Sequence, residues 1–240
     1  MTPKIALSIL FALGTMTSFA QQDAKTQEIL KQDWACLHCF ADSNSKVPEP
    51  GAGENRVVFM GNSITIGWLR LNPEFFAGKP YLDRGIGGQT TPQMLIRFRP
   101  DVINLKPKVV VILAGTNDIA GNTGYTSNET IFGNIVSMVE LARANGIRVV
   151  ISSILPAFDY PWRPGMDPVH RIPTLNAQLK AYAESHHVVY LDYFSAMVDE
   201  RGGLKKELTS DGVHPTKDGY LVMGPLVEKA IAEALTMKIK

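Results

Sequence analysis

The sequence predicts a three-layer α/β/α sandwich around a five-stranded parallel sheet. Five short apolar runs alternate with segments of helical length, and such runs are typical of strands covered on both faces. Crossover connections between parallel strands are right-handed, which places helices on both sides of the sheet. With 240 residues, the chain is long enough for one such domain with a substantial core.

The expected strands are taken in chain order. The first covers residues 57–60, Val-Val-Phe-Met, and enters a Gly-Asn-Ser turn. The others are residues 81–84, 109–114, 149–154 and 188–191. Each is mostly apolar without strict alternation, as a buried parallel strand requires.

The expected helices are residues 91–105, 128–144, 169–186 and 217–235. Ala144-Asn145-Gly146 is a good helix stop before the fourth strand, and Thr216 is a candidate cap for the last helix. Residues 156–168 contain four prolines and form a stiff loop after a strand, which we expect to border the functional site. Residues 51–240 are therefore assigned to one main domain.

The first fifty residues are expected to hold an export signal, a helix and a linker. Lys4, the apolar stretch 5–13 and Ser18-Phe19-Ala20 have the layout of a signal peptide over residues 1–20, cleaved after Ala20. A buried or membrane-anchored first helix is the alternative, but the stretch is short for a bilayer, and no cysteine follows the cleavage site directly. We expect a periplasmic or secreted protein without a membrane anchor, in which residues 21–50 pack on the main domain.

The two cysteines, Cys36 and Cys39, form a C-x-x-C pair. Haem attachment would need a histidine after the second cysteine, where Phe40 stands, and a zinc site would need two more ligands. Residues 24–45 have helical spacing, whereas a thioredoxin-like site would follow a strand. An intrahelical disulfide and two packed thiols both remain open, and no metal or cofactor is expected.

Composition excludes some partners. The chain has 24 basic and 23 acidic residues, a net charge of +1, and no basic run. We therefore expect neither nucleic acid nor an anionic membrane as the main partner. A small molecule is the expected partner, and the oligomeric state is open.

Three side chains of complementary chemistry stand beside strand ends or turns. Ser63 follows the first strand, and Asp211 and His214 lie three residues apart in a glycine-containing loop. A serine attacks only when a base takes its proton, which histidine can do with a reference pKa of about 6.5, and a carboxylate can orient that histidine. Taken alone, the Asp-x-x-His pair is also typical of an ordinary turn.

Acyl transfer also needs donors aimed at the developing oxyanion. The backbone N–H of Ser63, the Gly87-Gly88 pair after the second strand and the side chain of Asn117 after the third are available. The glycines and Asn117 could each be simple turn residues, but all three sources follow neighbouring strands.

Four sequence blocks resemble those of the SGNH (GDSL-type) hydrolases. They are Gly61-Asn62-Ser63-Ile64-Thr65, Gly85-Ile86-Gly87-Gly88-Gln89-Thr90, Gly115-Thr116-Asn117-Asp118 and Asp211-Gly212-Val213-His214-Pro215. The resemblance implies a flavodoxin-like fold with Ser63 as nucleophile, His214 as base and Asp211 as orienting acid. It also implies an oxyanion hole from the Ser63 N–H, the Gly88 N–H and the Asn117 side chain. Gly-Ile-Gly-Gly is similar to the platelet-activating-factor acetylhydrolase branch.

Two positions depart from the family pattern, which has aspartate where Asn62 stands and commonly where Gln89 stands. Both replacements keep hydrogen bonding and remove a charge, so the turn at Ser63 could be looser. The G-x-S-x-G elbow of ordinary α/β-hydrolases is absent because Thr65 occupies its last position.

The expected function is an exported carboxylic ester hydrolase that removes small acyl groups, acetyl first, through an acyl-enzyme. Acetylated carbohydrates are the favoured substrates, with Trp68, Tyr160 and Trp162 as candidate substrate contacts. A lipid-type ester hydrolase of the lysophospholipase or platelet-activating-factor acetylhydrolase kind is the alternative enzyme. A non-catalytic carbohydrate-binding module is the alternative of a different class.

Overall fold

The computed structural model describes residues 32–238, and the fold belongs to the unit that begins at Ala35. The expected signal peptide, residues 1–20, lies outside the described residues. Within residues 32–238, no helix is both long enough and apolar enough to cross a membrane.

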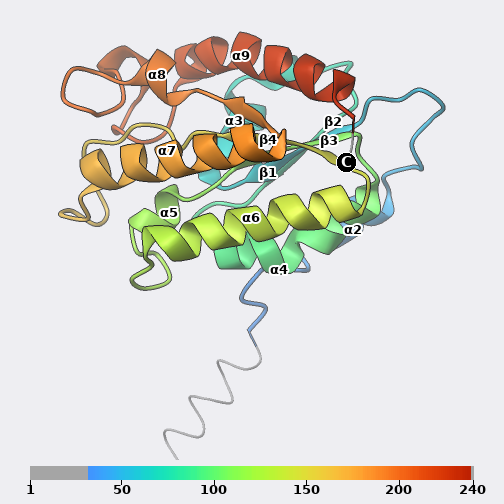
Figure 1. Cartoon of the computed structure of the whole chain (residues 1–240), viewed down its shortest axis with the longest axis horizontal. Coiled ribbons are helices and arrows are strands. Elements are labelled where there is room, and N and C mark those ends of the chain that lie inside the picture. Colours follow the sequence, from blue (N-terminus) through green and yellow to red (C-terminus); the bar gives the residue numbers. More distant parts are fainter. Residues whose placement is uncertain (1–31, 239–240) are drawn as a thin grey trace, which may run out of the picture. The chain divides into compact units, whose positions relative to one another are not determined.

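A five-stranded parallel sheet forms the centre of this unit (Figure 1). The strands are β1 (Val57–Gly61), β2 (Tyr81–Gly85), β3 (Val109–Leu113), β4 (Arg148–Ser152) and β5 (Val189–Leu191). Their order is β2-β1-β3-β4-β5, so the chain starts inside the sheet, moves outward to β2 and then returns across β1 to β3. This reversal places a topological switch point at the carboxyl ends of β1 and β3, where open α/β folds bind ligands.

Helices cover both faces of the sheet, which confirms the predicted sandwich. The main helices are α3 (Ser63–Leu71), α4 (Thr91–Asp101), α6 (Asn128–Ala144), α7 (Pro168–His186) and α9 (Lys217–Thr236). Shorter turns are α2 (Ala41–Ser45), α5 (Thr116–Ile119), α8 (Phe194–Met197), η1 (Pro73–Phe75), η2 (Ile103–Leu105) and η3 (Lys206–Leu208).

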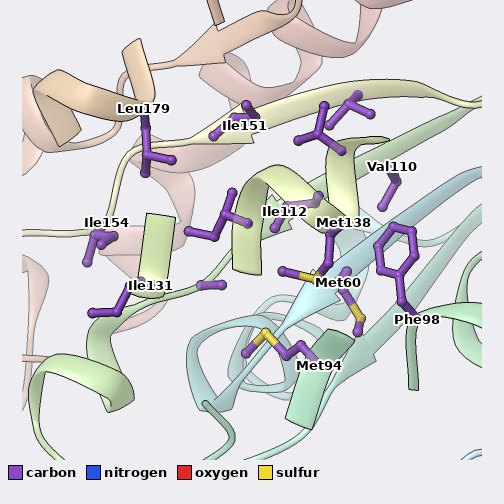
Figure 2. Packing of buried hydrophobic residues seen from close by; sticks show 14 of the residues in the cluster. Met60, Met94, Phe98, Val110, Ile112, Ile131, Met138, Ile151, Ile154 and Leu179 are labelled. Atoms are coloured by element: carbon purple, nitrogen blue, oxygen red, sulfur yellow. The ribbon is translucent and has the colours of Figure 1, made fainter. Parts of the chain in front are cut away.

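Each strand divides its side chains between two cores. On one face, Met60 and Ile112 pack with Phe98 of α4, Met138 of α6 and Leu179 of α7 (Figure 2). On the other face lie the alternate strand residues, together with apolar residues of α3 and α9. This period of two on doubly buried strands explains why the sequence shows apolar runs rather than alternation.

Some element boundaries differ from the prediction. The helix expected over residues 91–105 ends at Asp101 because Val102 leaves the helical conformation, and η2 follows and ends at Leu105, before Lys106 in the left-handed region. The last strand begins at Val189 rather than at Val188, since the Val188 N–H closes α7 by donating to the carbonyl of Ala183.

The N-terminal segment corrects the helix expected over residues 24–45. Residues 24–31 lie outside the described part, residues 34–40 form turns or irregular structure, and helix appears only in α2. Cys36 adopts a positive φ of 56°, which a helix interior does not accommodate. Cys36 and Cys39 form a disulfide, so the disulfide is not intrahelical and the packed-thiol alternative is wrong.

Candidate active site

Ser63 is placed by a tight junction between β1 and α3. Asn62 caps α3, because its Oδ1 accepts a hydrogen bond from the N–H of Ile64 at 3.0 Å. Gly61 and Gly85 are required here: a Cβ on Gly61 would overlap the Thr65 side chain, and one on Gly85 would overlap the backbone at the start of α3. The junction therefore leaves Ser63 partly exposed at the carboxyl edge of the sheet.

His214 reaches Ser63 from the loop before α9. Its Nε2 lies 2.8 Å from Ser63 Oγ, and its Nδ1 lies 2.7 Å from Asp211 Oδ2. The loop is closed by Thr209, whose hydroxyl donates to the carbonyl of His214 at 2.8 Å and accepts from the N–H of Gly212 at 3.0 Å. Thr216 caps α9 by accepting from Gly219 N–H, as the sequence predicts. Serine, imidazole and carboxylate thus form one hydrogen-bonded row.

The electrostatics of this row suit proton transfer from the serine. Partial burial alone would raise the pKa of Asp211, but hydrogen bonds from the backbone N–H and ring of His214 and from Val213 outweigh it and lower that pKa. An ionised Asp211 favours the tautomer with the proton on Nδ1, which leaves Nε2 free to accept from Ser63. This geometry is what general-base activation of a serine requires.

The three expected oxyanion donors come shortly after strand residues that are paired with one another across the sheet. Gly61 is paired with Gly85 on one side and with Leu113 on the other. Counted along the chain from these three paired residues, Ser63 lies two residues further on, Gly88 three and Asn117 four. Asn117 is buried, and its Nδ2 donates to the carbonyl of Gln89 at 2.9 Å, so one amide N–H holds the second block in place. Gly88 lies exposed at the edge with a φ of 76°.

Asn62 and Gln89, the two residues that depart from the family pattern, each make defined contacts. Asn62 is buried and supplies the α3 cap, while its Nδ2 has no hydrogen-bond partner among the described residues. Gln89 is also buried: its Nε2 donates to the Ala35 carbonyl at 2.8 Å, and its Oε1 accepts from Arg97 Nε at 2.5 Å. An aspartate could not make the donation to Ala35, so glutamine at this position ties the disulfide segment to the second block.

The aromatic residues proposed as substrate contacts require a correction. Trp68 is 2% exposed in a cluster with Phe59, Phe75 and Tyr220, and Tyr160 is fully buried with its hydroxyl 3.1 Å from Thr116 Oγ1. Neither side chain can contact a substrate. The sequence offers an aromatic ring for stacking on a sugar, but it does not distinguish that use from core packing, which here takes up the large apolar area of both rings.

Trp162 differs from these two aromatics. It is 43% exposed, and its ring centroid lies 5.9 Å from that of His214. Its Nε1 donates to Oδ1 of Asn122 at 3.0 Å. Asn122 was not predicted from the sequence, because no pattern distinguishes a lone asparagine in a glycine-rich loop from an ordinary turn residue.

Known proteins resemble this chain in sequence and in fold. The model of the GDSL-like lipase/acylhydrolase family matches residues 59–222. The crystal structure of a candidate acylhydrolase from Bacteroides fragilis NCTC 9343 superposes with a TM-score of 0.84 and 51% identity, over 85% of this chain and 100% of that one. Human platelet-activating factor acetylhydrolase IB subunit alpha2 is 29% identical over 174 residues, 70% of this chain and 72% of that protein.

A further relative is an uncharacterised lipoprotein of Bacillus subtilis (strain 168), which is 29% identical over 173 residues, 65% of this chain. The matched region spans 63% of that lipoprotein, slightly less than two thirds of its length.

Proposed function

Because this chain belongs to the GDSL-like lipase/acylhydrolase family and is therefore an ester hydrolase, we propose that it is an exported serine esterase that removes small acyl groups, acetyl first, from carbohydrates. The observation that carries the proposed mechanism is the row from Ser63 Oγ through His214 to Asp211, at 2.8 and 2.7 Å. A non-catalytic carbohydrate-binding module would have no use for such a row.

The reaction follows from the proton positions in this row. Ser63 Oγ attacks the ester carbonyl while His214 Nε2 takes the serine proton, and the Asp211 carboxylate stabilises the resulting imidazolium. The negative charge on the former carbonyl oxygen is stabilised by the N–H groups of Ser63 and Gly88 and by the Asn117 amide. His214 then returns the proton to the departing alcohol, which leaves an acetyl ester on Ser63.

A second half-reaction regenerates the enzyme. Water attacks the acetyl carbonyl while His214 takes one proton from that water, and this proton returns to Ser63 Oγ as acetic acid leaves with the other proton of the water. His214 and Ser63 end the cycle in the protonation states in which they began it.

Two observations support the choice of substrate. Trp162 presents an exposed aromatic surface beside His214, and aromatic surfaces can pack against sugar rings. The human relative is by name an acetylhydrolase, which supports a short acyl group. The same name is the observation that favours the second candidate, an acetyl ester of a lipid. Export is proposed from residues 1–20 alone, as the sequence analysis argues.

Replacement of Ser63 by alanine tests the proposed chemistry. We expect Ser63→Ala to lose about 10³-fold or more of kcat on 4-nitrophenyl acetate while it keeps the wild-type melting temperature. Ser137→Ala, at a half-buried serine of α6, is the matched control and should behave like the wild type. Turnover by Ser63→Ala close to that of the wild type would refute the nucleophile assignment.

A substrate panel tests the acyl and alcohol groups. We expect kcat/KM to fall as the acyl chain of the 4-nitrophenyl ester grows, and an acetylated oligosaccharide to be hydrolysed faster than an acetylated glycerophospholipid. Preference for long acyl chains would overturn the small-acyl proposal, and preference for the phospholipid would establish the second candidate.

A further inference from the structure

Asn122 lies where three parts of the candidate site meet. Its backbone N–H donates to the carbonyl of Asn117 at 3.0 Å, which anchors it to the segment after β3. Its side-chain Nδ2 donates to the carbonyl of Gly88 at 3.1 Å, and its Oδ1 accepts from Trp162 Nε1 at 3.0 Å. Asn122 therefore connects Gly88 and Asn117, two of the three expected oxyanion donors, with the ring of Trp162 beside His214.

The orientation of the Asn122 amide is determined by these partners. A carbonyl oxygen can only accept and an indole N–H can only donate, so the amide nitrogen must face Gly88 and the amide oxygen must face Trp162. Rotating the amide by half a turn would break both bonds. The two hydrogen bonds are therefore coupled through one amide: loss of the indole donor removes one of the two contacts that hold the amide in the orientation that reaches Gly88.

Gly88 has particular need of such a contact. It lies exposed, with a φ of 76°, and glycine is the residue with the most backbone freedom. Beyond its two chain neighbours, a Cβ built on Gly88 would have only the Asn122 amide nitrogen within 4 Å, at 3.9 Å, so this side of the residue is otherwise open. The neighbouring Thr90 and Thr123 hydroxyls, 3.1 Å apart, bring the same two loops together.

At the other end of the connection, Trp162 contacts the base. Its ring lies 5.9 Å from that of His214 at an interplanar angle of 38°, and 5.3 Å from the ring of buried Tyr160. The indole is thus held by the Tyr160 ring and by the Asn122 amide, and it lies beside the imidazole that is hydrogen-bonded to Ser63.

We propose that Asn122 and Trp162 are positioning residues that keep the Gly88 N–H and the His214 ring in place relative to each other. We call these two side chains the brace. This inference rests on the proposed esterase function. The brace acts on groups whose interactions strengthen as charge develops in the transition state, so its loss lowers kcat rather than raising KM.

A double-mutant cycle tests the brace. Asn122→Ala removes the amide, and Trp162→Phe keeps an aromatic ring but removes the N–H. We expect each single variant to lower kcat for 4-nitrophenyl acetate about 3- to 10-fold, the worth of one hydrogen bond, with KM within about twofold of the wild type. The double variant should lose no more than the more affected single variant, because both changes break the same coupled contact.

Two further variants separate positioning from general damage. Asn104→Ala alters an exposed asparagine in η2, at the opposite end of β3, and should leave kcat unchanged. Trp162→Leu also removes the ring from beside His214, and it should lower kcat further and change the pH dependence of kcat, which Trp162→Phe should leave unchanged. Melting temperatures of all variants show whether the fold is kept.

The outcomes are distinguishable from failure of the esterase proposal itself, which Ser63→Ala decides. If Ser63→Ala is inactive while Asn122→Ala and Trp162→Phe turn over like the wild type, the brace is refuted and the esterase stands. If the fold-losses of kcat in the two single variants multiply in the double variant, the two hydrogen bonds act independently and the coupling is refuted. A rise in KM with unchanged kcat would show instead that both residues only contact substrate.

Discussion

At the scale of single residues, two backbone N–H groups decide how the Asp211 carboxylate is oriented. Its Oδ1 accepts from the N–H of Val213 at 2.9 Å and from that of His214 at 2.8 Å, so Oδ2 alone faces the imidazole. The Asp-x-x-His spacing thus closes a turn and also places a carboxylate oxygen against the imidazole. The turn is observed, and the same geometry is compatible with the proposed orienting role of Asp211.

This orientation makes the result of Asp211→Asn predictable. The amide oxygen should remain on the two backbone donors, which forces the NH₂ group to face His214 Nδ1. The ring must then carry its proton on Nε2, where it cannot accept from Ser63. We expect kcat to fall about 10⁴-fold, as for a triad held in the wrong tautomer, with little change in melting temperature.

The matched control is Asp192→Asn, since Asp192 is exposed and its Oδ1 likewise accepts from a backbone N–H, that of Ser195. It should turn over at the wild-type rate. Wild-type kcat in Asp211→Asn would show that the carboxylate does not set the tautomer of His214.

At the scale of elements, one buried arginine ties α4 to the strand that carries Ser63. Arg97 is fully buried and donates to Gln89 Oε1 at 2.5 Å, to Asp101 Oδ2 at 2.9 Å and to the Gly61 carbonyl at 2.9 Å. Asn44 of α2 donates to the other oxygen of Asp101 at 2.7 Å. The end of β1, the second block and the N-terminal segment therefore share one polar network inside the protein.

Removing one partner of this network should be costly. Arg97→Met keeps an apolar stem of similar length but leaves the buried Asp101 carboxylate without its ion-pair partner. We expect the free energy of unfolding to fall by about 3–5 kcal/mol in a urea titration. Arg99→Met, at an exposed arginine of the same helix, should change it by at most about 0.5 kcal/mol. Equal effects of both variants would contradict the role of the network.

Comparison of predicted and observed helices shows which segments the local sequence determines and which depend on distant contacts. Helix α6 occupies the predicted residues 128–144, because a serine cap and an Asn-Gly stop both lie in the local sequence. The segment before α2 was predicted as a helix from its apolar spacing, yet Leu37 is exposed and Ala35 is buried. The disulfide and the bond from Ala35 to Gln89 override the local helical pattern there, and neither partner choice is visible in a short window of sequence.

At the scale of the whole molecule, two buried carboxyl groups make stability depend on pH. Burial raises the pKa of Asp83 to about 6, although the N–H of Gly85 and the charges of Arg84 and Arg97 oppose the rise. Burial likewise raises the pKa of Asp118 to about 6 against hydrogen bonds from Thr91. Between pH about 4 and 6 the folded state holds more protons at these sites than the unfolded chain, so their contribution to stability falls as pH rises.

Asp83→Asn isolates this effect, because its amide oxygen can still accept from Gly85 N–H, as Asp83 Oδ1 does at 2.8 Å. Near pH 4 the variant and the wild type should unfold with similar free energies. By pH 7 the variant should be the more stable by about 3 kcal/mol, the equivalent of a pKa difference of about two units. The difference should appear in urea titrations between these two pH values, and parallel pH profiles of the two proteins would contradict the prediction.

The order of strands and helices, the fold class and the blocks around Ser63, Asn117 and His214 were determined by the sequence itself, because each depends on apolar periodicity or on a short local motif. Tertiary structure decided which side chains meet. It placed His214 against a serine 151 residues earlier, buried Trp68 and Tyr160, and brought Asn122 between Gly88 and Trp162. Local patterns set which elements form, whereas contacts between distant residues depend on how those elements pack, and packing alone selects among equally polar or aromatic candidates.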